Sequence, residues 1–176
     1  HGLQYFSGLA IENLWKDTTY NVVEIDFSEI KNITSFEDFE KQLSDTLESA
    51  FKPIGFERDK TSDIRLIKQL SAWMKTTPAN SIVLLIDEYD SPLTACLGNK
   101  ELFQSVRTRL ASFYATVKAN DRCFRFVFMT GIAKFNQTGI FSELNNFSDV
   151  SLRPDYGKLL GYSEDDINEY FADYLD

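Results

Sequence analysis

The sequence contains little of the chemistry that histidine and cysteine provide. Its single histidine is the first residue, His1, so the rest of the chain offers no histidine for a catalytic triad, a general base or a metal site. Its two cysteines, Cys96 and Cys123, match neither a Cys-x-x-Cys metal motif nor a disulfide framework. We therefore expect two reduced thiols and a function that rests on other side chains.

Long apolar runs and positive charge are also scarce. No stretch approaches the roughly 20 apolar residues of a membrane span, and no leader-like pattern opens the chain, so we expect a soluble, cytosolic protein without a membrane partner. The formal net charge of −9 disfavours a broad nucleic-acid surface, because such a surface needs clustered Lys and Arg. With 176 residues, 43% of them hydrophobic, the composition indicates one ordered domain spanning residues 1–176.

A phosphate-binding loop is missing as well. No G-x-x-x-x-G-K-[ST] sequence occurs, and the nearest pieces, Gly98-Asn-Lys100, Gly131-Ile-Ala-Lys134 and Gly157-Lys158, lack the spacing. The backbone amides and the lysine of such a loop cradle the phosphates of a bound nucleotide, and its Ser or Thr holds Mg²⁺. From these residues alone we expect weak nucleotide binding at best and no useful turnover.

What the sequence does contain is an alternation of strand and helix patterns. Apolar residues at helical spacing predict helices, and short β-branched and aromatic runs predict strands. The expected strands cover residues 20–27, 82–86, 123–129 and 147–152, and the expected helices cover 34–51, 62–76, 100–118 and 163–174. A Thr34-Ser-Phe-Glu37 capping box opens the first helix. The β-α-α-β-α-β order predicts an α/β fold, a three-layer sandwich with a mostly parallel sheet covered by helices on both faces.

The segment 82–93 carries the strongest functional signal. An unbroken aliphatic run leads into the carboxylates of Asp87, Glu88 and Asp90, which fits a buried parallel strand that ends at the ligand-binding edge of the sheet. A hydrophobic strand followed by Asp-Glu is the Walker B pattern of phosphate-hydrolysing enzymes. In that interpretation Asp87 holds Mg²⁺, Glu88 polarises the attacking water, and Asp90 lines the cofactor site. The alternative is a strand that ends in a solvated acidic turn.

A second polar residue ends the next expected strand. Thr130 follows the apolar segment 123–129, and in P-loop enzymes of the additional-strand class a polar residue at that place, sensor 1, contacts the γ-phosphate or the attacking water. Adjacent strands that end in Asp-Glu and in Thr bring all three groups around one point. The alternative is that Thr130-Gly131 is a turn that only ends a strand.

Several blocks of the sequence resemble one family. Residues Leu84–Leu93, Met129–Phe135 and Ile140–Leu152 together are similar to the predicted AAA-ATPase family, and Tyr5–Ile11 and Gly161–Asp166 are similar to further segments of it. The resemblance covers nearly the whole chain, and its most specific parts are Asp-Glu-Tyr-Asp and Leu-Asn-Asn. Members often carry a nuclease-like domain of the PD-(D/E)XK type further along the chain.

The resemblance implies roles for the candidate site residues. The acidic pair that ends the strand is the Walker B pair, Thr130 lies at sensor 1, and Arg153 is a candidate arginine finger. Asn145 and Asn146 belong to the signature block, which gives them no defined chemical role; side-chain amides could hold a phosphate or, in preference, a backbone loop. The family's phosphate loop lies upstream of residue 1, so we expect this chain to be a fragment that lacks the central Walker A strand of a P-loop NTPase-like sheet.

Three functions remain open at this point. The first is the core of an ATPase that binds ATP and Mg²⁺ only together with the missing loop and is inactive alone. The second is a degenerate NTPase fold that acts as an interaction or switch module, through a protein partner or self-association. The third is a metal-dependent nuclease that uses Asp87, Glu88 and Asp90 with Lys134, which the acidic composition disfavours.

Overall fold

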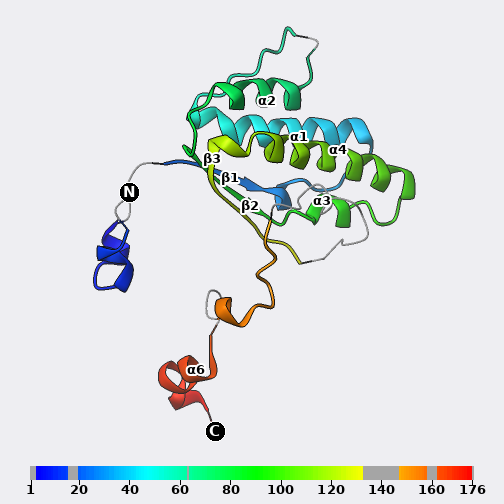
Figure 1. Ribbon diagram of the computed structural model, residues 1–176. Coiled ribbons are helices and arrows are strands. Elements are labelled where there is room, and N and C mark those ends of the chain that lie inside the picture. The colour runs from blue at the N-terminus through cyan, green and yellow to red at the C-terminus, as the bar shows by residue number, and fades with distance from the viewer. Residues whose placement is uncertain (1–2, 16–19, 63, 133–146, 158–161, 176) are drawn as a thin grey trace. The chain divides into compact units, whose positions relative to one another are not determined.

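The computed structural model describes residues 3–15, 20–62, 64–132, 147–157 and 162–175. The chain forms two compact units, His1–Leu144 and Asn145–Asp176. The first unit contains the sheet and the helices that pack on it, and the second contains short helical segments (Figure 1). The candidate catalytic residues all belong to the first unit.

The described strands and helices of the first unit follow the predicted β-α-α-β-α-β order. The strands are β1 (Asn21–Asp26), β2 (Ile82–Asp87) and β3 (Phe124–Met129), and the α-helices are α1 (Phe36–Phe51), α2 (Leu66–Thr76), α3 (Ser91–Thr94), α4 (Lys100–Ala119) and, in the second unit, α6 (Glu164–Tyr170). Short 3₁₀ turns are η1 (Leu3–Phe6), η2 (Ala10–Asn13), η3 (Phe27–Glu29), η4 (Lys52–Ile54), η5 (Asp121–Cys123), η6 (Pro154–Tyr156) and η7 (Ala172–Tyr174). None of the described helices has both the length and the apolar character that a bilayer crossing requires.

The described strands form one parallel sheet in the order β1-β2-β3. In the central strand, Leu84 pairs with Val23 of β1 on one side and with Val127 of β3 on the other. The same register sets Asp26 beside Asp87 at the carboxyl edge of the sheet. The α/β class and the parallel sheet that the sequence predicts are thus confirmed.

Helices α1, α4 and α2 lie over one face of this sheet (Figure 1). α1 packs on β1, α4 packs on α1, and α2 packs on α4, so the sheet, the α1–α4 pair and α2 form three layers. The connections from β1 to β2 and from β2 to β3 both move in the same direction across the sheet. Right-handed connections that move in the same direction place their helices on the same face of the sheet. The helices expected on the opposite face are not among the described residues.

The opposite face of the sheet is open in the described part of the chain. Val22, Val83 and Phe126 lie in one row across the three strands, and Val22 and Phe126 are 49% and 54% exposed. Phe126 stacks on Phe128 of the same strand, with ring centroids 6.1 Å apart. Among the described strands β3 pairs only with β2. This face and the outer edge of β3 therefore present groups that parallel sheets ordinarily bury.

The core lies between the sheet and the helices. Both central helices present the apolar stripe that helical spacing predicts, and aromatic rings fill much of the space. Phe27, just beyond β1, meets Phe113 of α4 edge to face, with ring centroids 6.1 Å apart. The buried side chains of the two helices are Phe39, Leu43, Leu47 and Phe51 of α1 and Val106, Leu110, Phe113, Tyr114 and Val117 of α4.

The cap of α1 differs from the prediction by one residue. Ser35, not Thr34, is the N-cap: its Oγ accepts a hydrogen bond from Asp38 N–H at 3.1 Å. Thr34 instead donates to the Asp38 carboxylate from its N–H and its hydroxyl. The N–H of Thr34 and then the amide of Gln42 lower the pKa of Asp38. Two adjacent hydroxyl residues competed for one cap, and the sequence pattern alone did not choose between them.

The start of α2 and the expected strand over residues 147–152 were both predicted wrongly. α2 begins at Leu66 and not near residue 62, because the Gln69 side-chain amide donates to backbone oxygens of the preceding loop, at 2.6 Å to Ile64 O. Ile64, expected to face inward, is 56% exposed. Residues 147–152 contain no strand: Ser151 N–H donates to Asp149 Oδ1 at 2.9 Å, a local turn that Asp and Ser favour.

The second unit is built of short helical turns. As predicted, Ser163 caps the helix α6: its Oγ accepts from Asp166 N–H at 3.2 Å, and its own N–H donates to the Asp166 carboxylate at 2.8 Å. Tyr162 packs edge to face on Phe171, with ring centroids 5.2 Å apart. Local capping and one ring contact thus account for the order in this helix.

Glu40 of α1 and Arg109 of α4 join the two central helices by a bidentate ion pair. Arg109 Nη2 donates to Glu40 Oε2 at 2.8 Å, and Arg109 Nε donates to Glu40 Oε1. The side chain of Arg109 is 12% exposed and that of Glu40 is 31% exposed. Because both charges are partly withdrawn from water, removal of one leaves the other without adequate solvation.

We expect Arg109→Ala to lower the free energy of unfolding by about 1–2 kcal/mol. This change is larger than the loss of an exposed ion pair causes and smaller than the loss of one partner of a fully buried pair causes. Chemical denaturation followed by circular dichroism measures the change. The matched control is Lys60→Ala, since Lys60 pairs with Glu48 at 3.3 Å but is 71% exposed, and its loss should cost less than about 0.5 kcal/mol. Equal effects of the two substitutions would contradict this account of the pair.

Candidate functional site

The carboxyl ends of β2 and β3 bring Asp87 and Thr130 together at one edge of the sheet. Asp87 is the last residue of β2, and Thr130 directly follows β3. Thr130 N–H donates to Ile86 O at 2.9 Å, which continues the ladder one residue beyond the strand. In this position Thr130 Oγ1 donates a hydrogen bond to Asp87 Oδ1. Two residues that the sequence places at separate strand ends are therefore in direct contact.

Glu88 follows Asp87 in a strained backbone conformation. Its φ is +48°, in the left-handed region that residues other than glycine seldom adopt. Its N–H donates to Asp87 Oδ1 at 3.0 Å, and its C=O accepts from Ser91 N–H at 2.9 Å. Such a conformation costs about 1–3 kcal/mol and persists where the surrounding structure fixes it, commonly at functional sites. The strain and the half-buried side chain both mark Glu88 as a candidate.

Asp90 is turned toward the segment that follows β3. It is 4% exposed, and its Oδ1 accepts a hydrogen bond from Ile132 N–H at 3.2 Å. Beside it, the C=O of Tyr89 accepts from the buried Tyr114 hydroxyl at 3.5 Å. Burial, together with Tyr89 and Asp90, raises the pKa of Tyr114 well above its ordinary value, so this hydroxyl remains a proton donor. The sequence assigns Asp90 to a cofactor, whereas the structure gives its carboxylate a backbone partner.

The donors at this edge suit Mg²⁺ in kind. The hydrogen bonds that Asp87 accepts from Glu88 and Thr130 both involve Oδ1, which leaves Oδ2 without a hydrogen bond from the described residues. Carboxylate oxygens are ligands that Mg²⁺ takes together with water and substrate phosphates. The described part of the chain gathers no three His, Cys, Asp or Glu side chains around a metal position. Asp87 is therefore the described residue at this edge that could hold such an ion.

The nuclease hypothesis has no geometric support in the described residues. It requires Asp87, Glu88 and Asp90 to converge on one ion, but the buried Asp90 carboxylate is directed at a backbone N–H. No such group of acids is present among the described side chains. Lys134, its expected basic partner, lies outside the described residues.

The other candidates from the sequence are not among the described residues of the first unit. Asn145 and Asn146 are outside the described residues, and their role stays a prediction. Arg153 belongs to the second unit, where its Nη2 lies 3.2 Å from an Asp155 carboxylate oxygen and its guanidinium lies 5.4 Å from the Tyr156 ring centroid. Its role as an arginine finger likewise stays a prediction.

Gly131 also lies at this edge. From the sequence it was interpreted only as a turn residue, and its packing against Asp90 and Tyr89 was missed. A Cβ atom at Gly131 would lie 2.4 Å from Asp90 Oδ1 and 2.4 Å from Tyr89 Cε1. The signal in the sequence is a glycine directly after Thr130, the residue expected at sensor 1. What the glycine faces depends on tertiary structure, so the sequence shows the residue without its reason.

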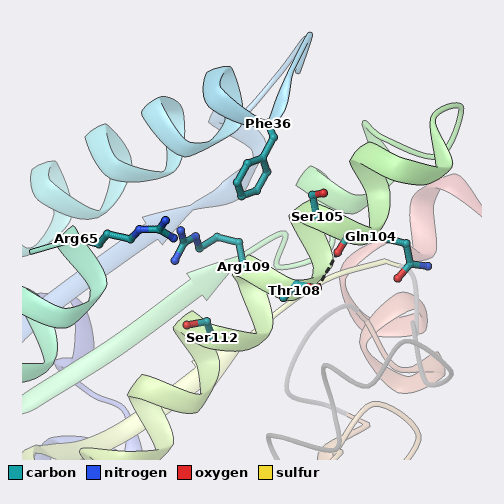
Figure 2. Close-up of a pocket in the computed structure, with 7 residues that line it drawn as sticks. All are labelled: Phe36, Arg65, Gln104, Ser105, Thr108, Arg109 and Ser112. Atoms are coloured by element: carbon teal, nitrogen blue, oxygen red, sulfur yellow. Dashed lines mark hydrogen bonds between the residues drawn. The ribbon is translucent and has the colours of Figure 1, made fainter.

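A hollow of about 490 Å³ lies on the helical side of the first unit (Figure 2). Its lining residues are Phe36, Arg65, Gln104, Ser105, Thr108, Arg109 and Ser112. Figure 2 shows the side chains of Arg65 and Arg109 directed toward each other. Several of its polar groups are already satisfied, since Thr108 donates to Gln104 O at 2.9 Å and Glu40 holds Arg109. The hollow contains none of the candidate catalytic residues, which leaves the sheet edge as the candidate site.

A family model described as Predicted AAA-ATPase matches residues 2–141, which is most of the chain. The chain belongs to this family. The matched region includes Asp87, Glu88 and Thr130 and ends before Asn145. As a member of the predicted AAA-ATPase family, the chain carries the acidic strand end and Thr130 within the part that the family model matches.

The chain is also similar to an uncharacterized protein in the vnfD 5′ region of Azotobacter chroococcum mcd 1. The two are 28% identical over 171 residues, which is 97% of this chain and 33% of that relative. The chain thus spans about a third of the length of the relative. No solved structure matches the chain significantly.

We expect Glu88→Gly to leave the free energy of unfolding within about 0.5 kcal/mol of the wild type, because relief of left-handed strain offsets the greater flexibility of the unfolded chain. Thermal and chemical denaturation measure the change. The control Lys41→Gly, at an exposed position inside α1, should cost about 1 kcal/mol. The same loss at both positions would show that the conformation of Glu88 stores no strain.

Proposed function

We propose that the chain is part of an ATP-binding and ATP-hydrolysing domain, to which it contributes the Walker B and sensor residues. The observation that carries this proposal is the hydrogen bond from Thr130 to Asp87 at the carboxyl edge of a parallel sheet. Ligands of open α/β sheets bind outside the carboxyl ends of the strands. Membership of a family described as predicted AAA-ATPase supports the same chemistry.

Each residue of the edge has its own role in this proposal. Asp87 would hold Mg²⁺ with its carboxylate. The Thr130 hydroxyl donates to that carboxylate and orients it, and its oxygen lone pairs are free to accept a hydrogen bond from the attacking water. Glu88, next in the chain, orients the attacking water and accepts its proton. ATP with Mg²⁺ supplies the transferable phosphoryl group and the neutralising charge when bound.

The phosphate loop is the part that the proposal assigns to another segment of the protein. A strand that pairs in parallel with the outer edge of β3 ends beside Thr130, so the loop after that strand adds its amides to the site. A helix after the loop covers the open face that exposes Val22 and Phe126. The relative from Azotobacter extends well beyond the region that this chain matches.

The test is ATP turnover by the full-length protein, wild type beside Glu88→Gln. We expect Glu88→Gln to lose at least about 100-fold in kcat, because a positioned general base contributes that much or more. ATP binding, measured by calorimetry, should be retained since the amide preserves the size of the side chain. Glu57→Gln, at an exposed loop position, is the matched control and should turn over ATP as the wild type does. Undiminished turnover in Glu88→Gln would reject the assigned role.

A second candidate function, an interaction module, has the open sheet face in its favour. If this face binds a second copy of the chain, sedimentation velocity of the wild type will show association that increases with concentration. Phe126→Asp places a charge on the exposed apolar face and should abolish that association, because an unpaired charge is costly to bury. A wild-type protein that stays monomeric at all concentrations argues against the module.

A further inference from the structure

Besides the hydrogen bond from the Thr130 hydroxyl to Asp87, three hydrogen bonds join the end of β2 and the residues after it to the segment after β3. Thr130 N–H donates to Ile86 O at 2.9 Å, and Tyr89 N–H donates to Thr130 O at 3.0 Å, so both backbone groups of Thr130 are held from the opposite segment. The third bond, from Ile132 N–H to Asp90 Oδ1 at 3.2 Å, depends on a side chain. A substitution at Asp90 therefore removes one anchor and leaves the backbone ladder intact.

The backbone and the side chain of Asp90 are both fixed. Its C=O accepts from the N–H groups of Leu93 and Thr94, at 3.1 and 3.0 Å, so the first turn of α3 holds the backbone. The residue is 4% exposed. A buried carboxylate is costly unless it is hydrogen-bonded, and the N–H of Ile132 offsets part of that cost. The carboxylate thus has a reason to remain at the turn.

The turn itself lies directly against Asp90 and Tyr89. A Cβ atom at Gly131 would come within 2.4 Å of the Asp90 carboxylate and within 2.4 Å of the Tyr89 ring, so only glycine fits without displacement. Tyr89 is 7% exposed and Asp90 is 4% exposed, so both side chains are buried beside the turn. The same two residues therefore hold the turn by packing and by hydrogen bonding.

We propose that Asp90 is a positioning residue: its carboxylate, packed on Gly131, holds the Thr130–Ile132 turn so that the Thr130 hydroxyl reaches Asp87. The consequence for ATP turnover rests on the proposed function. A positioning role and a cofactor-binding role require different properties of the Asp90 side chain. An acceptor for Ile132 N–H needs an oxygen atom in the right place, whereas a cation site needs the negative charge.

Asp90→Asn and Asp90→Ala separate these two roles. Asp90→Asn keeps an oxygen that accepts from Ile132 N–H, so we expect its kcat in the full-length protein to be within about threefold of the wild type. Asp90→Ala removes the acceptor and should lower kcat by about 100-fold, because a displacement near 1 Å at a catalytic group has an effect of that size. The KM for ATP should change little in either. Asp45→Ala, on the exposed side of α1, is the control. Equal large losses in both Asp90 variants would overturn the proposal.

Gly131→Ala tests the same contact with Asp90 left in place. We expect it to lower kcat by about 100-fold while KM for ATP stays within about threefold. Gly98→Ala is the matched control, because its added methyl meets nothing within 4 Å. If the two alanine variants turn over ATP equally well, the packing of the turn on Asp90 does not position Thr130.

Hydrogen exchange provides a readout that is independent of turnover. In the full-length protein the peptide containing Ile132 should exchange faster in Asp90→Ala than in the wild type or Asp90→Asn, while peptides of β2 keep their protection. Unchanged exchange in Asp90→Ala overturns the role of Asp90 whether or not ATP is hydrolysed. Faster exchange in a protein whose wild type does not hydrolyse ATP supports that role and rejects the ATPase proposal.

Discussion

The candidate site depends on the register of the three parallel strands. Because Ile86 pairs with Met129, the residues that follow them, Asp87 and Thr130, come to lie together at the carboxyl edge. A slip of one residue would turn the Thr130 side chain to the other face and remove its hydrogen bond to Asp87. Burial fixes this register, since alternate residues of β2 are at most 2% exposed on the helical side and a slip would expose them. The chemistry of the edge is thus set by the packing of the core.

In the segment that follows β2, the residue proposed to act on water and the residues that stabilise the backbone are neighbours. Glu88, the residue proposed to act on water, has the strained backbone, and such strain persists only where other contacts over-determine it. Those contacts come from the next two residues. Tyr89 donates its N–H to Thr130 O, and Asp90 accepts from Ile132 N–H. In the proposed function, the Asp-Glu-Tyr-Asp block therefore combines two residues that act on the ligand with two that hold the adjacent turn.

Local sequence patterns predicted the features that depend on residues close together in the chain. Apolar spacing placed the three strands and the buried faces of α1 and α4, and the acidic strand end located the site. The choice of Ser35 over Thr34 as cap was missed because it depends on geometry within a single turn. The one-sided helical layer was missed because it follows from strand order, which no local pattern encodes. The contact of Gly131 with Asp90 joins residues far apart in sequence, so only the tertiary structure reveals it.

In the proposed function, the open side of the sheet and the phosphate loop are connected by geometry. Neighbouring strands lie about 4.8 Å apart, so a parallel strand added outside β3 ends about that far from Thr130, whereas one added outside β1 ends about three times as far away. Only the first position brings backbone amides to the phosphates of a nucleotide that contacts Thr130 and Asp87. That position is also where the described sheet exposes Phe126 and leaves β3 paired on one side. The apolar face and the proposed nucleotide site thus favour a strand at the same position, the face because it would be buried and the site because the loop after the strand would reach the phosphates.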